Sequence, residues 1–166
     1  MTFSFTVTSK TGDMYKVSLL SGDDAFFAKG DILNIVGENI EIVEIDLDRI
    51  KGNSQTDTAV LSKIADGIAN YFISNEKVVL YYYCDDLAEL PASPKRGEMW
   101  PQEYRSMLFS LMFKRYLIRH DISDVIDVTI MIEQGPRPLL MHLIARKKHQ
   151  KYLDLVRSYI IDNYGK

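Results

Sequence analysis

Residues 78–84 read Val-Val-Leu-Tyr-Tyr-Tyr-Cys, a continuous apolar and aromatic run that decides the fold. A strand that reads as apolar without alternation is typically buried on both of its faces. The run therefore predicts a central strand of a sheet, and the segments on either side of it are interpreted relative to that strand.

The chain before this run is rich in strand patterns. Apolar and polar residues alternate through residues 2–20, around the turn-forming residues 9–13, which predicts a β-hairpin. Residues 32–36 and 40–47 predict a second strand pair. A short helical turn is expected near residues 23–28.

Helical patterns flank the central run, and two more strands come near the end of the chain. Apolar residues at spacings of three and four predict the helices, and Pro101 suits the first turn of one of them. The expected helices cover residues 58–74, 101 to about 119, and 148–163, and the expected late strands cover 125–132 and 139–145. The sequence thus predicts one α+β domain over residues 1–166. Its antiparallel or mixed sheet has about six to seven strands, with three helices packed against it.

Composition indicates an ordinary globular protein, with 46% hydrophobic and 26% charged residues. The N-terminus lacks the basic and apolar regions of a signal peptide, and no stretch approaches the roughly 18 apolar residues of a membrane span. Cys84 is the single cysteine, so no intrachain disulfide can form. We therefore expect a cytoplasmic protein without a membrane partner.

Charge is divided unevenly along the chain. Residues 1–90 carry a balance of −8, and residues 91–166 carry +5. Two interpretations stay open: oppositely charged faces that help subunits associate, or a basic surface for an acidic partner such as nucleic acid.

The end of the central strand is the segment where we expect a binding site. Asp85 and Asp86 follow Cys84, a long loop carries Arg96, and Arg105 lies on the next helix. These carboxylates and guanidinium groups could meet across the loop, either as a structural pair or as a site for an anionic substrate. A buried cysteine at such a position is usually an inert core residue, so we expect Cys84 to be unreactive.

A basic run precedes the last helix and includes Arg146, Lys147, Lys148 and Lys151. Such a run at a helix entry could bind phosphates. Short basic runs are more often solvated surface, so nucleic acid is not the partner that we expect.

Motifs for metals and cofactors are missing. None of His120, His142 and His149 stands at metal-ligand spacing, and the sequence contains neither of the Gly-rich phosphate motifs. We expect no cofactor, no metal site and no catalytic residue, and we interpret His142 as a hydrogen-bonded sheet residue.

One resemblance rests on a small set of residues. Tyr83, Cys84 and Asp85 at the strand end, with Arg105, Leu108 and Phe109 on the next helix, resemble a family of small uncharacterised bacterial proteins that contain a domain of unknown function. The resemblance covers most of residues 1–146. It implies a bacterial, cytoplasmic protein and no particular activity.

The leading functional hypothesis is a non-catalytic binding module that acts through protein–protein contacts, as a homo-oligomer or with another protein. The 10 Tyr and 7 Phe residues suit contact surfaces. Two alternatives stay open: an enzyme whose site lies at residues 84–86 with Arg96 and Arg105, and nucleic-acid binding through residues 146–151.

Overall fold

The computed structural model describes most of the chain. The described residues are 2–22, 25, 37–54, 57–84, 101–133 and 139–164, and a few side chains within them, that of Arg105 included, are not described. The expected strand 32–36 and most of the expected helical turn at 23–28 lie outside the described residues.

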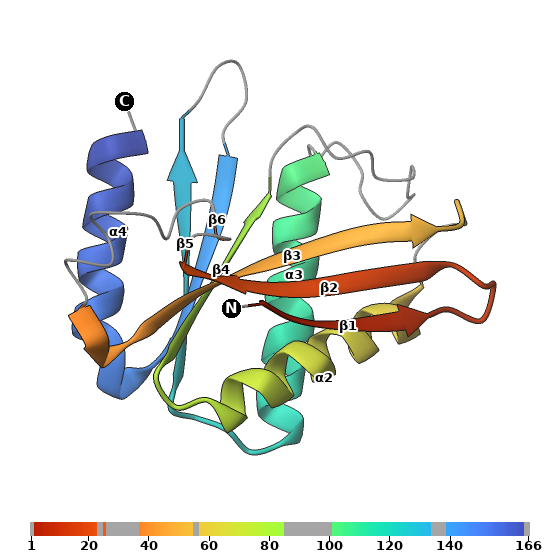
Figure 1. The fold of residues 1–166 in the computed structure, drawn as a ribbon, viewed down its shortest axis with the longest axis horizontal. Helices are drawn as coiled ribbons and strands as arrows, with labels where there is room; N and C mark the ends of the chain where they lie inside the picture. Colours follow the sequence, from red (N-terminus) through yellow and green to blue (C-terminus); the bar gives the residue numbers. More distant parts are fainter. Residues whose placement is uncertain are drawn as a thin grey trace.

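A single mixed sheet of six strands forms the centre of the described structure, in the order β1-β2-β3-β4-β6-β5 (Figure 1). Only β3 and β4 run parallel, and every other neighbouring pair is antiparallel. The strands are β1 (Thr2–Thr8), β2 (Met14–Ser21), β3 (Glu41–Lys51), β4 (Val78–Cys84), β5 (Val125–Ile132) and β6 (Leu139–Arg146). The expectation of a mixed α+β sheet is confirmed.

Most residues of β4 are buried, on both faces of the sheet, as the apolar run predicts. Val79 and Tyr81 face one core, and Val78 and Leu80 face the other. The strand lies between β3 and β6, which are themselves inner strands, so apolar side chains are required on both of its sides.

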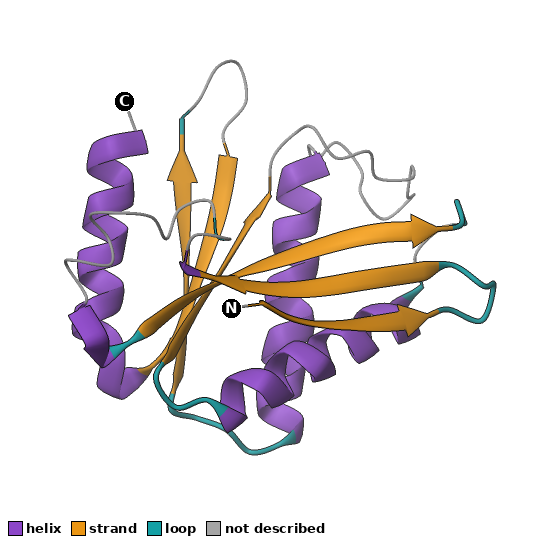
Figure 2. Cartoon of the chain, viewed as in Figure 1, coloured by secondary structure: helices purple, strands orange, loops and turns teal. Residues whose placement is uncertain are grey.

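Among the described residues, α-helices cover both faces of the sheet (Figure 2). Helices α2 (Thr58–Ser74) and α3 (Pro101–Arg119) share a core with Val43, Leu80 and Ile144, on one face of the sheet. Helix α4 (Gln150–Tyr164) packs its buried residues on the opposite face; these are Leu153, Val156 and Ile160. These three helices of the described residues were predicted, and α2 and α3 have the predicted bounds.

Helix α2 begins where a cap is available. The side chain of Asp57 accepts a hydrogen bond of 2.7 Å from the backbone N–H of Val60, one of the groups that a helix start leaves unpaired. Further along, Gly67 lets β1 approach the helix: a β-carbon there would lie 2.5 Å from Cε2 of the Phe5 ring. The glycine thus allows β1 to pack closely on α2.

Two element boundaries differ from the prediction by two residues or more. Strand β3 continues to Lys51 rather than ending near residue 47, because it pairs with β2 along its whole second half. The last helix begins at Gln150 rather than at residue 148, because residues 147–149 form a separate 3-10 turn.

Candidate functional site

The predicted strand-end site lies mostly outside the described residues. Asp85, Asp86 and Arg96 are not described, and only the backbone of Arg105 is described, within α3. Cys84 is described and is completely buried, as expected for a core residue. The pairing of the carboxylates with the arginines therefore stays a prediction.

Arg146, the first residue of the predicted basic run, is held against the end of α2. Its guanidinium donates hydrogen bonds of 3.1 and 3.0 Å to the backbone oxygens of Phe72 and Ile73, and it lies 5.0 Å from the centre of the Phe72 ring. A cation at a helix C-terminus also interacts favourably with the helix dipole. Arg146 thus has a structural role in this position.

The other residues of the run differ in their contacts. Lys148 forms an exposed ion pair of 3.1 Å with Glu76, and the ammonium of Lys151 lies 4.7 Å from the centre of the Tyr152 ring. Lys147 is exposed. Burial, followed by the charges of Lys148 and Arg146, lowers the pKa of His149. Phosphate binding by these residues stays a prediction.

A polar cluster surrounds His142 inside the α2/α3 face of the sheet. The imidazole is fully buried, and its Nε2 lies 2.6 Å from the hydroxyl oxygen of Ser106 on α3. Its Nδ1 lies 3.1 Å from Oδ1 of Asp127 on β5. Two further hydroxyls, those of Ser110 and Thr129, lie 3.4 Å from Nδ1.

The register of the elements brings these residues together. Thr129 is directly opposite His142 in the β5–β6 ladder, and Asp127 is two residues away on the same face. Ser106 and Ser110 are four residues apart, so both project from one side of α3. Ser110 also donates a hydrogen bond of 3.1 Å to Oδ2 of Asp127.

The hydrogen bonds assign the imidazole tautomer. A carboxylate only accepts, so Asp127 places the proton on Nδ1 of His142. In the neutral imidazole, Nε2 then carries a lone pair and accepts from the Ser106 hydroxyl. A hydroxyl, a base and a carboxylate that orients the base are thus connected in one chain, which is the relationship that nucleophilic catalysis by serine uses.

An aromatic wall adjoins the cluster. The Phe109 ring lies 4.8 Å from the ring of Tyr82 in a stacked arrangement and 5.4 Å from the imidazole of His142. Ser106 retains 8% of its surface exposed, and the side chain of Asp127 retains 22%. The cluster therefore reaches the surface at Asp127, while His142 itself is enclosed.

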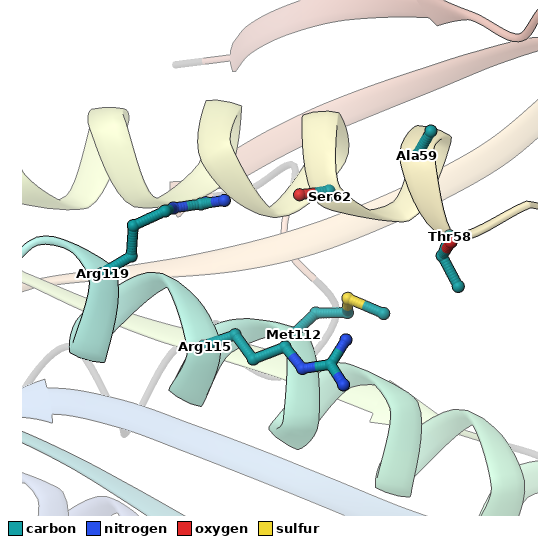
Figure 3. A pocket seen from close by; sticks show the side chains of 6 residues that line it. All are labelled: Thr58, Ala59, Ser62, Met112, Arg115 and Arg119. Carbon is teal, nitrogen blue, oxygen red and sulfur yellow. The ribbon is translucent and has the colours of Figure 1, made fainter.

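A shallow pocket of about 330 Å³ lies between α2 and α3 (Figure 3). Its lining residues are Thr58, Ala59, Ser62, Met112, Arg115 and Arg119. Arg119 is already paired with Asp66 at 2.5 Å, and both side chains are substantially exposed. The pocket thus offers the exposed guanidinium of Arg115 beside that of Arg119, and none of its described lining residues supplies a buried polar group to fix a ligand.

Strand β3 carries three acidic residues, Glu44, Asp46 and Asp48, on the face of the sheet opposite to α2 and α3. Burial raises the pKa of Asp46, and the neighbouring charges of Asp48 and Glu44 raise it further.

Among the residues that the structure describes, no group of three His, Cys, Asp or Glu side chains could hold a metal ion. Within the same described ranges, no helix is long and apolar enough to span a membrane.

Only one member of the His142 cluster was predicted from the sequence. The expectation that His142 is a hydrogen-bonded sheet residue is confirmed, whereas Ser106, Ser110, Asp127 and Thr129 were not predicted. The available signal was two serines spaced by four within the apolar face of the 101–119 helix. Such spacing marks polar groups that face the core and need partners there.

Comparison with known proteins adds no relative. No protein-family model matches the chain, and neither a curated protein nor a solved structure matches it. The resemblance to uncharacterised bacterial proteins stays a prediction.

Proposed function

We propose that this chain is a cytoplasmic binding module that acts through protein–protein contacts, and that its first partner is a second copy of itself. The observation that carries the proposal is strand β5. Among the described residues it is an edge strand that pairs only with β6.

Edge strands usually carry features that block further pairing, such as lysine or proline. Strand β5 reads Val-Ile-Asp-Val-Thr-Ile-Met-Ile and has neither of them. Its single charge is Asp127, and the side chain of Met131 is 61% exposed. The strand is therefore a suitable template for the addition of another strand.

Helix α3, which covers one face of the sheet, adds exposed apolar surface of its own. Met107, Leu111 and Ile118 are 41%, 40% and 70% exposed, and their spacing places them along one side of the helix. Exposed apolar residues that align in this way indicate a contact surface more strongly than scattered ones do.

The β5 strands of two copies can pair without placing like charges opposite each other. In an antiparallel pairing of two β5 strands centred on Thr129, Val128 lies opposite Ile130 of the second copy, and Asp127 lies opposite its Met131. The apolar cross-strand pairs stabilise the contact, and the two carboxylates stay apart. Such a two-fold interface is closed, so it yields a dimer rather than a filament.

Analytical ultracentrifugation over a concentration series tests this proposal. We expect a reversible dimer that Met131→Asp weakens, because the new carboxylate faces Asp127 of the second copy. Met131→Lys should retain the dimer, since it places opposite charges together. Ile50→Asp, at an exposed position on β3, is the matched control. A monomer at every concentration, or equal effects of the two Met131 substitutions, would contradict the proposal.

A further inference from the structure

We propose that Ser106, His142 and Asp127 form a nucleophilic serine site that accepts an acyl group from small esters. This inference goes beyond the proposed binding function and rests on a different observation, the contacts of His142, although Asp127 takes part in both. It also departs from the expectation that the chain has no catalytic residue, because that expectation depended on sequence motifs alone.

The geometry satisfies the requirements for an activated hydroxyl. The nucleophile and the base are 2.6 Å apart, and the base and its orienting carboxylate are 3.1 Å apart. Both distances fall within hydrogen-bond reach, and the carboxylate is on the imidazole nitrogen opposite the hydroxyl. Three different elements, α3, β5 and β6, contribute one residue each.

The position of the base limits its conformations. His142 is 0% exposed, and the ring of Phe109 lies against it. The imidazole therefore keeps the orientation in which Nε2 faces Ser106. A group held in this way needs little rearrangement before it accepts a proton.

The reaction that we propose balances as follows. The Ser106 oxygen forms a bond to the ester carbonyl carbon, and its proton passes to Nε2 of His142. The carbon–oxygen bond to the alcohol breaks, and the alcohol leaves with that proton. Water then attacks the acyl-serine through the same base, releasing a carboxylic acid and restoring the hydroxyl.

Asp127 acts as a positioning residue. It does not contact the acyl group, but it keeps the proton on Nδ1, so that Nε2 stays free to accept. The limited exposure of Ser106, at 8%, favours small and unhindered esters. p-Nitrophenyl acetate is therefore a suitable probe, and a small fluorophosphonate tests the same hydroxyl.

The test combines intact mass spectrometry, peptide mapping and the rate of p-nitrophenol release. We expect one acetyl or phosphonyl group per chain, located on Ser106, and no such adduct in Ser106→Ala. This variant should fold, since alanine is well tolerated in helices. His142→Gln should slow labelling by about 10²-fold or more, the usual contribution of a general base.

Control variants separate this site from background acylation. Ser158→Ala changes an exposed serine on α4 and should leave the labelling unchanged. Asp127→Asn should slow acylation and also change its pH profile, which the loss of a merely structural contact would not do. An unlabelled wild-type protein, or equal labelling of Ser106→Ala, would overturn the proposal. Neither labelling result bears on whether the protein forms a dimer. Each of the two proposals can therefore be contradicted while the other stands.

Discussion

The hydroxyl of Tyr81 donates a hydrogen bond of 2.5 Å to Oε2 of Glu44, and the two residues are register partners on the parallel strands β3 and β4. Tyr81 is 1% exposed and Glu44 is 4% exposed. A carboxyl group this deep in the α4-side core needs hydrogen-bond donors, because water does not reach it.

Tyr81→Phe should therefore lower the free energy of unfolding by about 1–3 kcal/mol, the usual penalty for a buried acceptor that loses its donor. Tyr71→Phe is the matched control, since the Tyr71 ring stacks on Phe3 and its hydroxyl makes no hydrogen bond within the described residues. Chemical denaturation of both variants measures the difference. Equal effects would show that the Glu44 contact adds nothing.

Glycine at position 52 should be required for a second reason besides its backbone angle. Gly12 and Gly52 both have positive φ, at 85° and 90°. A β-carbon at Gly12 would meet open space, whereas one at Gly52 would lie 2.9 Å from the α-carbon of Asp13 and closer still to its carboxyl group. Gly12→Ala should cost about 1–2 kcal/mol through strain alone. Gly52→Ala should cost at least about 1 kcal/mol more, because it overpacks the turn. Thermal unfolding of the two variants would refute this prediction if their losses were equal.

Asp13 should give the native state a contribution to stability that depends on pH. The hydrogen bond from Thr11 lowers the pKa of Asp13 below its ordinary value of 3.8. Burial raises this pKa and so offsets part of the effect, whereas hydrogen bonds from Ser54 and the charge of Arg49 lower it further. Because the folded state holds the ionised form more strongly, this contribution is complete above the ordinary value. It disappears as the pH falls through the lower, folded value.

The variant Thr11→Ala isolates that contribution. Its loss of stability relative to the unmodified protein should be greatest near neutral pH and should shrink as the pH falls below about 3.8. Thr8→Ala, an exposed threonine on β1, should give a difference that does not vary with pH. Denaturant unfolding at several pH values measures both. A Thr11→Ala difference that is constant, or that grows in acid, would contradict the assignment.

Local patterns predicted the elements of this fold well, because each depends on residues close together in sequence. The unbroken run at 78–84 indicated an inner strand, and the spacing at 58–74 indicated an amphipathic helix. The order of strands was not predicted. Strand β4 pairs with β6 rather than with its nearer neighbour β5, and no local pattern in the sequence indicates that choice.

The candidate site was harder to predict for the same reason. Ser106 and His142 are 36 positions apart, and Asp127 stands 15 positions before His142. In sequence, Ser106 interrupts an apolar helix face, and Asp127 is an ordinary polar residue of a half-buried strand. Their common chemistry arises only when α3 crosses the β5–β6 ladder. The predicted site at residues 85–105, in contrast, was chosen because its residues are close in sequence.

Arg146 provides the last prediction, because the structure gives it a role other than phosphate binding. Its side chain is 11% exposed, and its guanidinium bonds the last backbone oxygens of α2. Arg146→Ala should lower the free energy of unfolding by about 1–3 kcal/mol, since these carbonyls lose a charged donor. Arg146→Lys should restore only part of this loss, because an ammonium lacks the planar guanidinium that lies over the Phe72 ring.

Lys147→Ala is the matched control, one residue along the chain and exposed. It should change stability by less than about 0.5 kcal/mol. Binding of both variants to duplex DNA at several salt concentrations completes the test. If residues 146–151 served as a phosphate-binding surface, the two substitutions would weaken DNA binding alike and reduce its salt dependence. We expect instead that Arg146→Ala alters stability and leaves DNA binding unchanged, because the guanidinium of Arg146 is hydrogen-bonded to the end of α2.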